Sequence, residues 1–157
     1  MRVHPDYLDK QQMPPGSPRG DELWAQRYED INAFEKHLDR NGTKVIKFFL
    51  NVSKDEQKRR FLERLKNTKK HWKFSAADLE ERGFWDKYQD AYEDALTATS
   101  TESAPWYVIP ADHKWVTRAV VADIVTNTIR SLDLRYPELT DAQKTALQNA
   151  RNQLESE

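Results

Sequence analysis

A strand followed at once by a capped helix constrains this sequence more than any other feature. Residues 45–50, Val-Ile-Lys-Phe-Phe-Leu, are β-branched and aromatic, with apolar side chains at successive positions. A run of this kind is typical of a strand covered on both faces, as in a parallel sheet. Ser53 and Glu56 then have the spacing of a capping box, which predicts a helix to about Lys66. A strand joined directly to a helix is the unit of α/β folds, so we predict an α/β fold with a parallel sheet.

Further elements are predicted on both sides of this unit. Residues 1–20 are predicted to be an irregular leader, because residues 13–20 hold three prolines and two glycines. Asp21 is a candidate N-cap for a helix to about Arg40, whose apolar residues recur at helical spacing. The remaining elements are a helix at 84–97, a strand at 106–109, a helix capped by Asp112, and a polar helical tail over 137–157 that begins at a capping box of Thr140 and Gln143.

Only two strands are predicted, in residues 45–50 and 106–109. Two strands are too few to form a stable sheet between layers of helices. The sequence therefore reads as the second part of a larger domain. A sheet that lacks its first strands leaves an open edge and an apolar face, so we also predict a homo-oligomer.

Charge and composition exclude several classes of protein. Lys plus Arg number 25 and Asp plus Glu number 26, a balance that argues against a uniformly basic nucleic-acid binder. The chain has no cysteine, which excludes disulfides and thiolate metal sites. No apolar stretch approaches the roughly 20 residues that cross a bilayer, and the polar start of the chain does not resemble a signal peptide. We expect a cytoplasmic protein that acts on neither nucleic acid nor membrane.

Several motifs for phosphate or metal binding are missing from the sequence. The four glycines, at positions 16, 20, 42 and 83, are never followed by lysine, so the sequence has no Walker-type phosphate loop. The four histidines form no short-spaced metal-binding pair. We therefore predict neither a catalytic residue nor a metal ligand in this chain.

The strongest chemical signal is a concentration of positive charge. Residues 58–73 hold eight Lys or Arg side chains and one acid, Glu63. Arg60 and Arg64 lie one helical turn apart and share a face, so both can reach one polyanion. Such a segment is either a solvated helix face balanced by nearby carboxylates or a clamp for phosphate chains. The residue pattern alone leaves both interpretations open.

A series of motifs in this order resembles the polyphosphate kinase 2 family. The resemblance extends from about Arg2 to Pro137 and leaves the last twenty residues outside it. Its motifs are Arg2-Val3-His4-Pro5, Tyr28-Glu29-Asp30-Ile31-Asn32, Lys47-Phe48-Phe49-Leu50, Trp72-Lys73-Phe74-Ser75, Trp85-Asp86-x-Tyr88, Thr99-Ser100-Thr101 and Ala104-Pro105-Trp106-Tyr107-Val108-Ile109-Pro110-Ala111-Asp112.

The resemblance implies a P-loop-kinase-like, three-layer αβα fold, truncated here to few strands and many helices. It implies transfer of a phosphoryl group between inorganic polyphosphate and nucleoside mono- or diphosphates of the ADP/AMP or GDP class, with Mg²⁺ neutralising the phosphates. It places the C-terminal part of the family domain at residues 21–136, with a lid at about 54–97. The lid positions of the family fall on Arg60, Arg64 and Lys73, with Lys58, Arg59 and Lys70 as weaker candidates.

Family members carry their Walker A and Walker B motifs before the position of Arg2, and no residue here matches them. The resemblance thus implies a fragment of a polyphosphate-dependent phosphotransferase that is inactive alone. The alternative is a non-catalytic α/β remnant that binds a polyanion or a partner chain through its basic helix.

Overall fold

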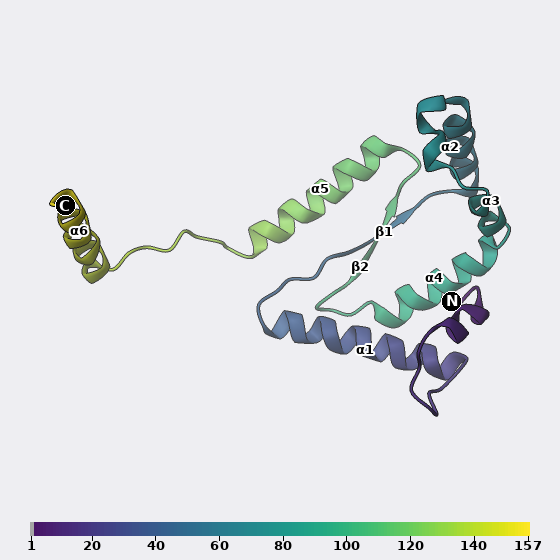
Figure 1. Ribbon diagram of the computed structural model, residues 1–157, viewed down its shortest axis with the longest axis horizontal. Helices are drawn as coiled ribbons and strands as arrows, with labels where there is room; N and C mark the ends of the chain where they lie inside the picture. The colour runs from purple at the N-terminus through teal and green to yellow at the C-terminus, as the bar shows by residue number, and fades with distance from the viewer. Residues whose placement is uncertain (1) are drawn as a thin grey trace. The chain divides into compact units, whose positions relative to one another are not determined.

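The computed structural model describes residues 2–157 and divides into two compact units, Met1–Ala122 and Asp123–Glu157 (Figure 1). The second unit holds the end of α5 and the whole of α6. None of the helices in residues 2–157 combines the length and apolarity of a membrane span. The elements in chain order are η1 (Pro5–Lys10), α1 (Asp21–Arg40), β1 (Lys47–Asn51), α2 (Lys54–Lys66), η2 (Thr68–Lys73), α3 (Ala77–Arg82), α4 (Trp85–Thr99), β2 (Trp106–Pro110), α5 (Lys114–Ser131) and α6 (Asp141–Glu155).

Strands β1 and β2 pair in parallel, with Lys47 opposite Trp106 and Asn51 opposite Pro110. The predicted α/β class with a parallel sheet is confirmed, and the chain is mostly helical as expected. The sheet is less covered than the apolar run at 45–50 predicts. Leu50 is 51% exposed and Val108 is 56% exposed, so the strands are not buried on both faces in the described residues. Self-association through this surface stays a prediction.

Most of the predicted helices are confirmed, and two of their predicted caps are wrong. The helix α1 begins at Asp21 itself, after Gly20, whose φ of 64° lies in the region that favours glycine. Asp112 does not cap α5, because its carboxylate instead accepts a hydrogen bond from the backbone of Ser53. The cap of α6 is confirmed, since Thr140 and Gln143 form a reciprocal capping box.

Residues 2–10 are more ordered than the predicted irregular leader. Pro5–Lys10 form the 3₁₀ helix η1, which buries Leu8. Arg2 forms an ion pair with Asp94 of α4, and the His4 ring lies 2.8 Å from a carboxylate oxygen of Glu81 in α3. The proline- and glycine-rich run at 13–20 contains no helix or strand, as predicted. Contacts with α3 and α4, which are distant in sequence, therefore order residues 2–10 of the predicted leader.

A buried ion pair and a hydrogen bond attach the amino end of β1 to the helices α1 and α4. The Lys47 ammonium lies 2.6 Å from the Glu35 carboxylate of α1, and the two side chains are only 9% and 11% exposed. Lys47 also donates to the carbonyl of Thr99 at the end of α4, and it lies 5.3 Å from the Trp106 ring centroid. The indole of Trp106 in turn donates to the Thr99 hydroxyl at 2.9 Å. One lysine thus joins α1, α4 and both strands.

Removing this lysine is expected to destabilise the fold strongly. Lys47→Ala leaves the Glu35 carboxylate buried without its partner, which costs about 3–5 kcal/mol in the free energy of unfolding. The measurement is urea unfolding followed by circular dichroism. Lys44→Ala is the matched control, because Lys44 is exposed and donates only to the carbonyl of Ser103. Equal losses for the two variants would show that the ion pair contributes little.

Candidate functional site

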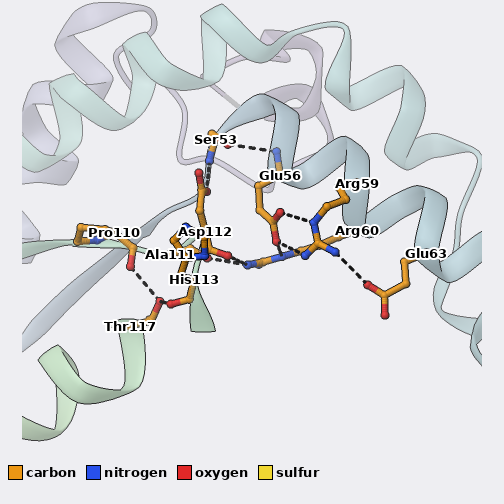
Figure 2. A network of polar contacts seen from close by, with 10 residues as sticks. All are labelled: Ser53, Glu56, Arg59, Arg60, Glu63, Pro110, Ala111, Asp112, His113 and Thr117. Atoms are coloured by element: carbon orange, nitrogen blue, oxygen red, sulfur yellow. Dashed lines mark hydrogen bonds and ion pairs between the residues drawn. The ribbon is translucent and has the colours of Figure 1, made fainter. Parts of the chain in front are cut away.

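The residues that follow β1 and β2 lie close together at the carboxyl end of the sheet. Ser53 follows β1, Asp112 follows β2, and the Ser53 amide donates to a carboxylate oxygen of Asp112 at 2.7 Å (Figure 2). This hydrogen bond lowers the pKa of Asp112. The amide of Ala111 donates to the carbonyl of Asn51 at 2.9 Å. In α/β folds, ligands bind outside this end of a parallel sheet, so these segments are placed where a site is expected.

The helix α2 starts at this edge because Ser53 caps it. The Ser53 hydroxyl accepts from the amide of Glu56 at 3.1 Å, which satisfies one of the free amides of the first turn. The Ser53 half of the predicted capping box is therefore confirmed, whereas the Glu56 carboxylate accepts from Arg59 and Arg60. As a result, the basic residues of α2 begin within two turns of the carboxyl end of β1.

Glu56 binds two of the predicted phosphate ligands. Its carboxylate accepts from the Arg59 guanidinium at 2.6 and 2.7 Å and from Nε of Arg60 at 2.7 Å. These hydrogen bonds, first from Arg59 and then from Arg60, lower the pKa of Glu56 to about 2. The carboxylate therefore stays ionised and paired in every ordinary buffer.

Arg60 lies against the loop that follows β2. Its Nη2 donates to the carbonyl of Ala111 at 2.6 Å and to that of Asp112 at 3.3 Å. Its side chain is 25% exposed, compared with 63% for Arg59. Figure 2 shows the guanidinium between Glu56 and this loop. The Arg60 charge thus serves contacts within the protein.

Two of the other predicted ligands lie beside aromatic rings. The Arg64 guanidinium carbon lies 5.5 Å from the Phe61 ring centroid, and Lys73 lies 4.8 Å from that of Trp72. Glu63 pairs with Lys70 at 3.4 Å and with Arg59 at 3.6 Å. Lys58 is exposed on α2. The structure therefore gathers Arg59, Arg60 and Lys70 around two acids.

The structure also forms a pocket that the sequence analysis did not predict. It has a volume of about 400 Å³ and lies between the end of β1 and the helices α2, α3 and α4. In its wall, Tyr88 donates to Glu81 at 2.6 Å, which lowers the pKa of Glu81 and raises that of Tyr88 to about 12. His4 is the second partner of Glu81, at a separation of 77 residues. Glu81 belongs to α3 and Tyr88 to α4. Tyr88 is part of one of the motifs named above, whereas no sequence signal singled out Glu81.

The described residues do not fit a metal centre. In residues 2–157, no group of three or more His, Asp or Glu side chains is placed to hold a metal ion. Glu56 already accepts from two guanidinium groups. In the described residues, the site therefore consists of cations paired with acids and with backbone carbonyls.

The Glu56 contacts should make stability depend on pH. A carboxylate whose pKa falls from 4.5 to about 2 on folding stabilises the protein above about pH 4.5. That contribution is lost as the pH falls through the folded-state value. The urea midpoint of the wild type should exceed that of Glu56→Gln at about pH 6, and the difference should shrink towards about pH 2.5. Gln57→Ala alters an uncharged neighbour, so the difference between its urea midpoint and that of the wild type should not shrink in this way as the pH falls.

Comparison with known proteins now identifies the family. The family model described as polyphosphate kinase 2 matches residues 19–137. An ADP-polyphosphate phosphotransferase of Rhodopseudomonas palustris is 49% identical over 98% of this chain and 53% of its own length. An AMP/ADP-polyphosphate phosphotransferase of Meiothermus ruber is 50% identical over 74% of this chain and 44% of its own length.

A solved structure agrees with these sequence matches. The crystal structure of polyphosphate kinase 2 from Arthrobacter aurescens TC1 superposes with a TM-score of 0.76 and 42% identity, over 93% of this chain and 48% of that one. The chain spans about half the length of these relatives. The matched region includes α2, η2 and both strands, which form the site described above. The chain belongs to the polyphosphate kinase 2 family.

Proposed function

We propose that this chain serves phosphoryl transfer between inorganic polyphosphate and nucleoside mono- or diphosphates. Family membership and the names of its relatives, which are ADP- and AMP/ADP-polyphosphate phosphotransferases, support this function. The observation that carries the proposal is the basic segment of α2 and η2, which starts at the carboxyl end of the parallel sheet. Nucleotides of the ADP/AMP class are the proposed partners, with the GDP class as a further candidate.

The role that we assign to the basic segment is to hold and neutralise the phosphate chain. Phosphoryl transfer depends on positioning and on compensating charge around the transferred group. Arg64, Lys58 and Lys73 have no carboxylate partner among residues 2–157, so their charge is available to an anion. Arg59 and Lys70 lie on the surface beside Glu63 and can exchange that acid for a phosphate.

Phosphate chemistry of this kind uses a divalent cation, and we propose Mg²⁺. The ion would screen the phosphates while the basic side chains hold the chain. The described residues offer no cluster of acids that would hold such an ion. Likewise, no glycine in the sequence is followed by lysine, so these residues supply no Walker-type cradle for the donor.

A non-catalytic role in binding a polyanion or partner chain is the second candidate. It is favoured by the combination of a basic segment with a sequence that lacks a Gly-Lys phosphate loop. A turnover assay with the isolated chain tests an expectation that the two candidates share, namely that these residues alone do not catalyse transfer. The purified 157-residue chain, polyphosphate, Mg²⁺ and ADP or AMP are incubated, and the nucleotide products are measured. Product that copurifies with the chain would show that these residues alone suffice, which neither candidate expects.

Binding of polyphosphate should depend on specific cations of the basic segment. Arg64→Ala is expected to weaken binding by about 1–3 kcal/mol, the value of a charge-assisted contact. Affinity should fall with salt, and the slope of log affinity against log salt should decrease by about one in this variant. Titrations of polyphosphate at several salt concentrations measure both quantities.

Lys36→Ala is the control for Arg64→Ala, because it removes one exposed positive charge from α1. It should leave affinity and salt slope close to those of the wild type. If Arg64→Ala behaves like Lys36→Ala, the basic segment is a solvated face and the proposed function loses its structural support.

A further inference from the structure

Arg60 differs from the other cations of α2 in how fully its donors are used. Its Nε binds Glu56, one turn earlier on the same helix, at 2.7 Å. Its Nη2 reaches the carbonyls of Ala111 and Asp112 at 2.6 and 3.3 Å. One guanidinium therefore joins α2 to the loop that follows β2.

This contact is the second of two attachments between α2 and that loop. The first is at the start of the helix, where the Ser53 amide donates to the Asp112 carboxylate at 2.7 Å. Arg60 lies two turns further along and binds the same loop through backbone carbonyls. Arg82 of α3 also holds the start of α2, through the Lys54 carbonyl at 2.8 Å and Gln57 at 2.7 Å. Arg60 adds a contact to the loop after β2 two turns along α2, which fixes the direction of the helix relative to that loop.

We infer that Arg60 is a positioning residue, which holds α2 on the carboxyl end of β2 without itself contacting polyphosphate. This inference rests on the proposed function for the role of the neighbouring cations. Arg64, one turn further along, is then presented to the phosphate chain at a fixed place. Moving the Arg60 side chain to a phosphate would leave the Ala111 carbonyl and the Glu56 carboxylate without this donor. The 5% exposure of Ala111 makes that loss costly, because water cannot readily replace the donor.

The shape of the side chain matters here more than its charge. A guanidinium is a planar group with five donors, so it can bind a carboxylate and a carbonyl in different directions at once. A lysine ammonium keeps the charge but cannot reproduce this fork. A residue that only neutralises phosphate tolerates lysine much better, because phosphate accepts a point charge from any direction.

Lysine substitutions at the two positions test the inference. Arg60→Lys is expected to reduce polyphosphate affinity about 10-fold with no change in the salt slope, because the count of charges at the ligand stays the same. It should also lower the urea midpoint. Arg64→Lys, the matched control one turn along, should keep the affinity within about 3-fold and leave the urea midpoint unchanged.

Affinity is measured under conditions in which circular dichroism shows each variant to be folded. A role in stability alone would lower the midpoint and leave the affinity of the folded protein unchanged, and that result would overturn the positioning role. Retained affinity in Arg60→Lys together with a smaller salt slope in Arg60→Ala would show direct contact with phosphate and also overturn it.

Labelling of the unaltered protein with phenylglyoxal gives an independent test that needs no variant. In free protein, Arg60 should react slowly and Arg64 quickly, as read by mass spectrometry of peptides. Added polyphosphate should protect Arg64 and leave the rate at Arg60 unchanged. Equal rates in free protein, or protection of Arg60 by polyphosphate, would overturn the inference. Protection at no arginine would count against the proposed function, while the free-protein rates would still decide whether Arg60 is held.

Discussion

Parallel pairing of β1 with β2 is the constraint on which the site depends. Because parallel strands end at the same edge of a sheet, the residues that follow β1 and β2 begin side by side. Ser53 and Asp112, far apart in sequence, therefore come within hydrogen-bond distance. Lys47 fixes the opposite end of the pair through its contacts with α1 and α4. The sheet is small, yet its two ends determine where α2 starts and what it rests on.

Concentrating positive charge on one segment has a cost, which local acids partly offset. Like charges a turn apart on a helix repel one another, and the segment at 58–73 holds eight cations. Glu56 and Glu63 compensate those nearest the sheet, and the low pKa of Glu56 keeps that compensation in place. Of the cations beyond them, Arg64 and Lys73 lie beside aromatic rings instead. Compensation is therefore strongest where α2 meets the loop after β2.

Sequence periodicity was sufficient to predict both strands and the longer helices, because these depend on local residues, but it did not predict η1, η2 or α3. The helix from Asp21 to Arg40, the cap at Ser53 and the strand ending at Pro110 all have local causes, and all are confirmed. The failures involve partners that are distant in the chain. Asp112 has the right place and chemistry for an N-cap, but Ser53 is the partner that the sheet brings to it. The order in η1 likewise depends on contacts of Arg2 and His4 with α3 and α4.

The same limit applies to the candidate ligands. Helical spacing makes Arg60 and Arg64 equivalent, since it says only that they share a face. The structure separates them because the loop after β2 passes one and not the other. Of the arginines that bind Glu56, Arg59 is 63% exposed and also pairs with Glu63, which is 56% exposed, so water can solvate Glu63 if a phosphate takes its place beside Arg59.

Arg60 cannot make that exchange so easily. Its partners include the backbone carbonyl of Ala111, a residue that is 5% exposed, so water does not readily replace the lost donor. An anion that approaches α2 therefore meets two kinds of cation. Cations whose partners are exposed acids or aromatic rings can turn towards the anion. Arg60, which binds the carbonyl of the buried Ala111, instead keeps the helix in place. Positive charge alone therefore does not make a side chain a phosphate ligand. A cation is free to bind phosphate when the partners that it leaves can be solvated by water.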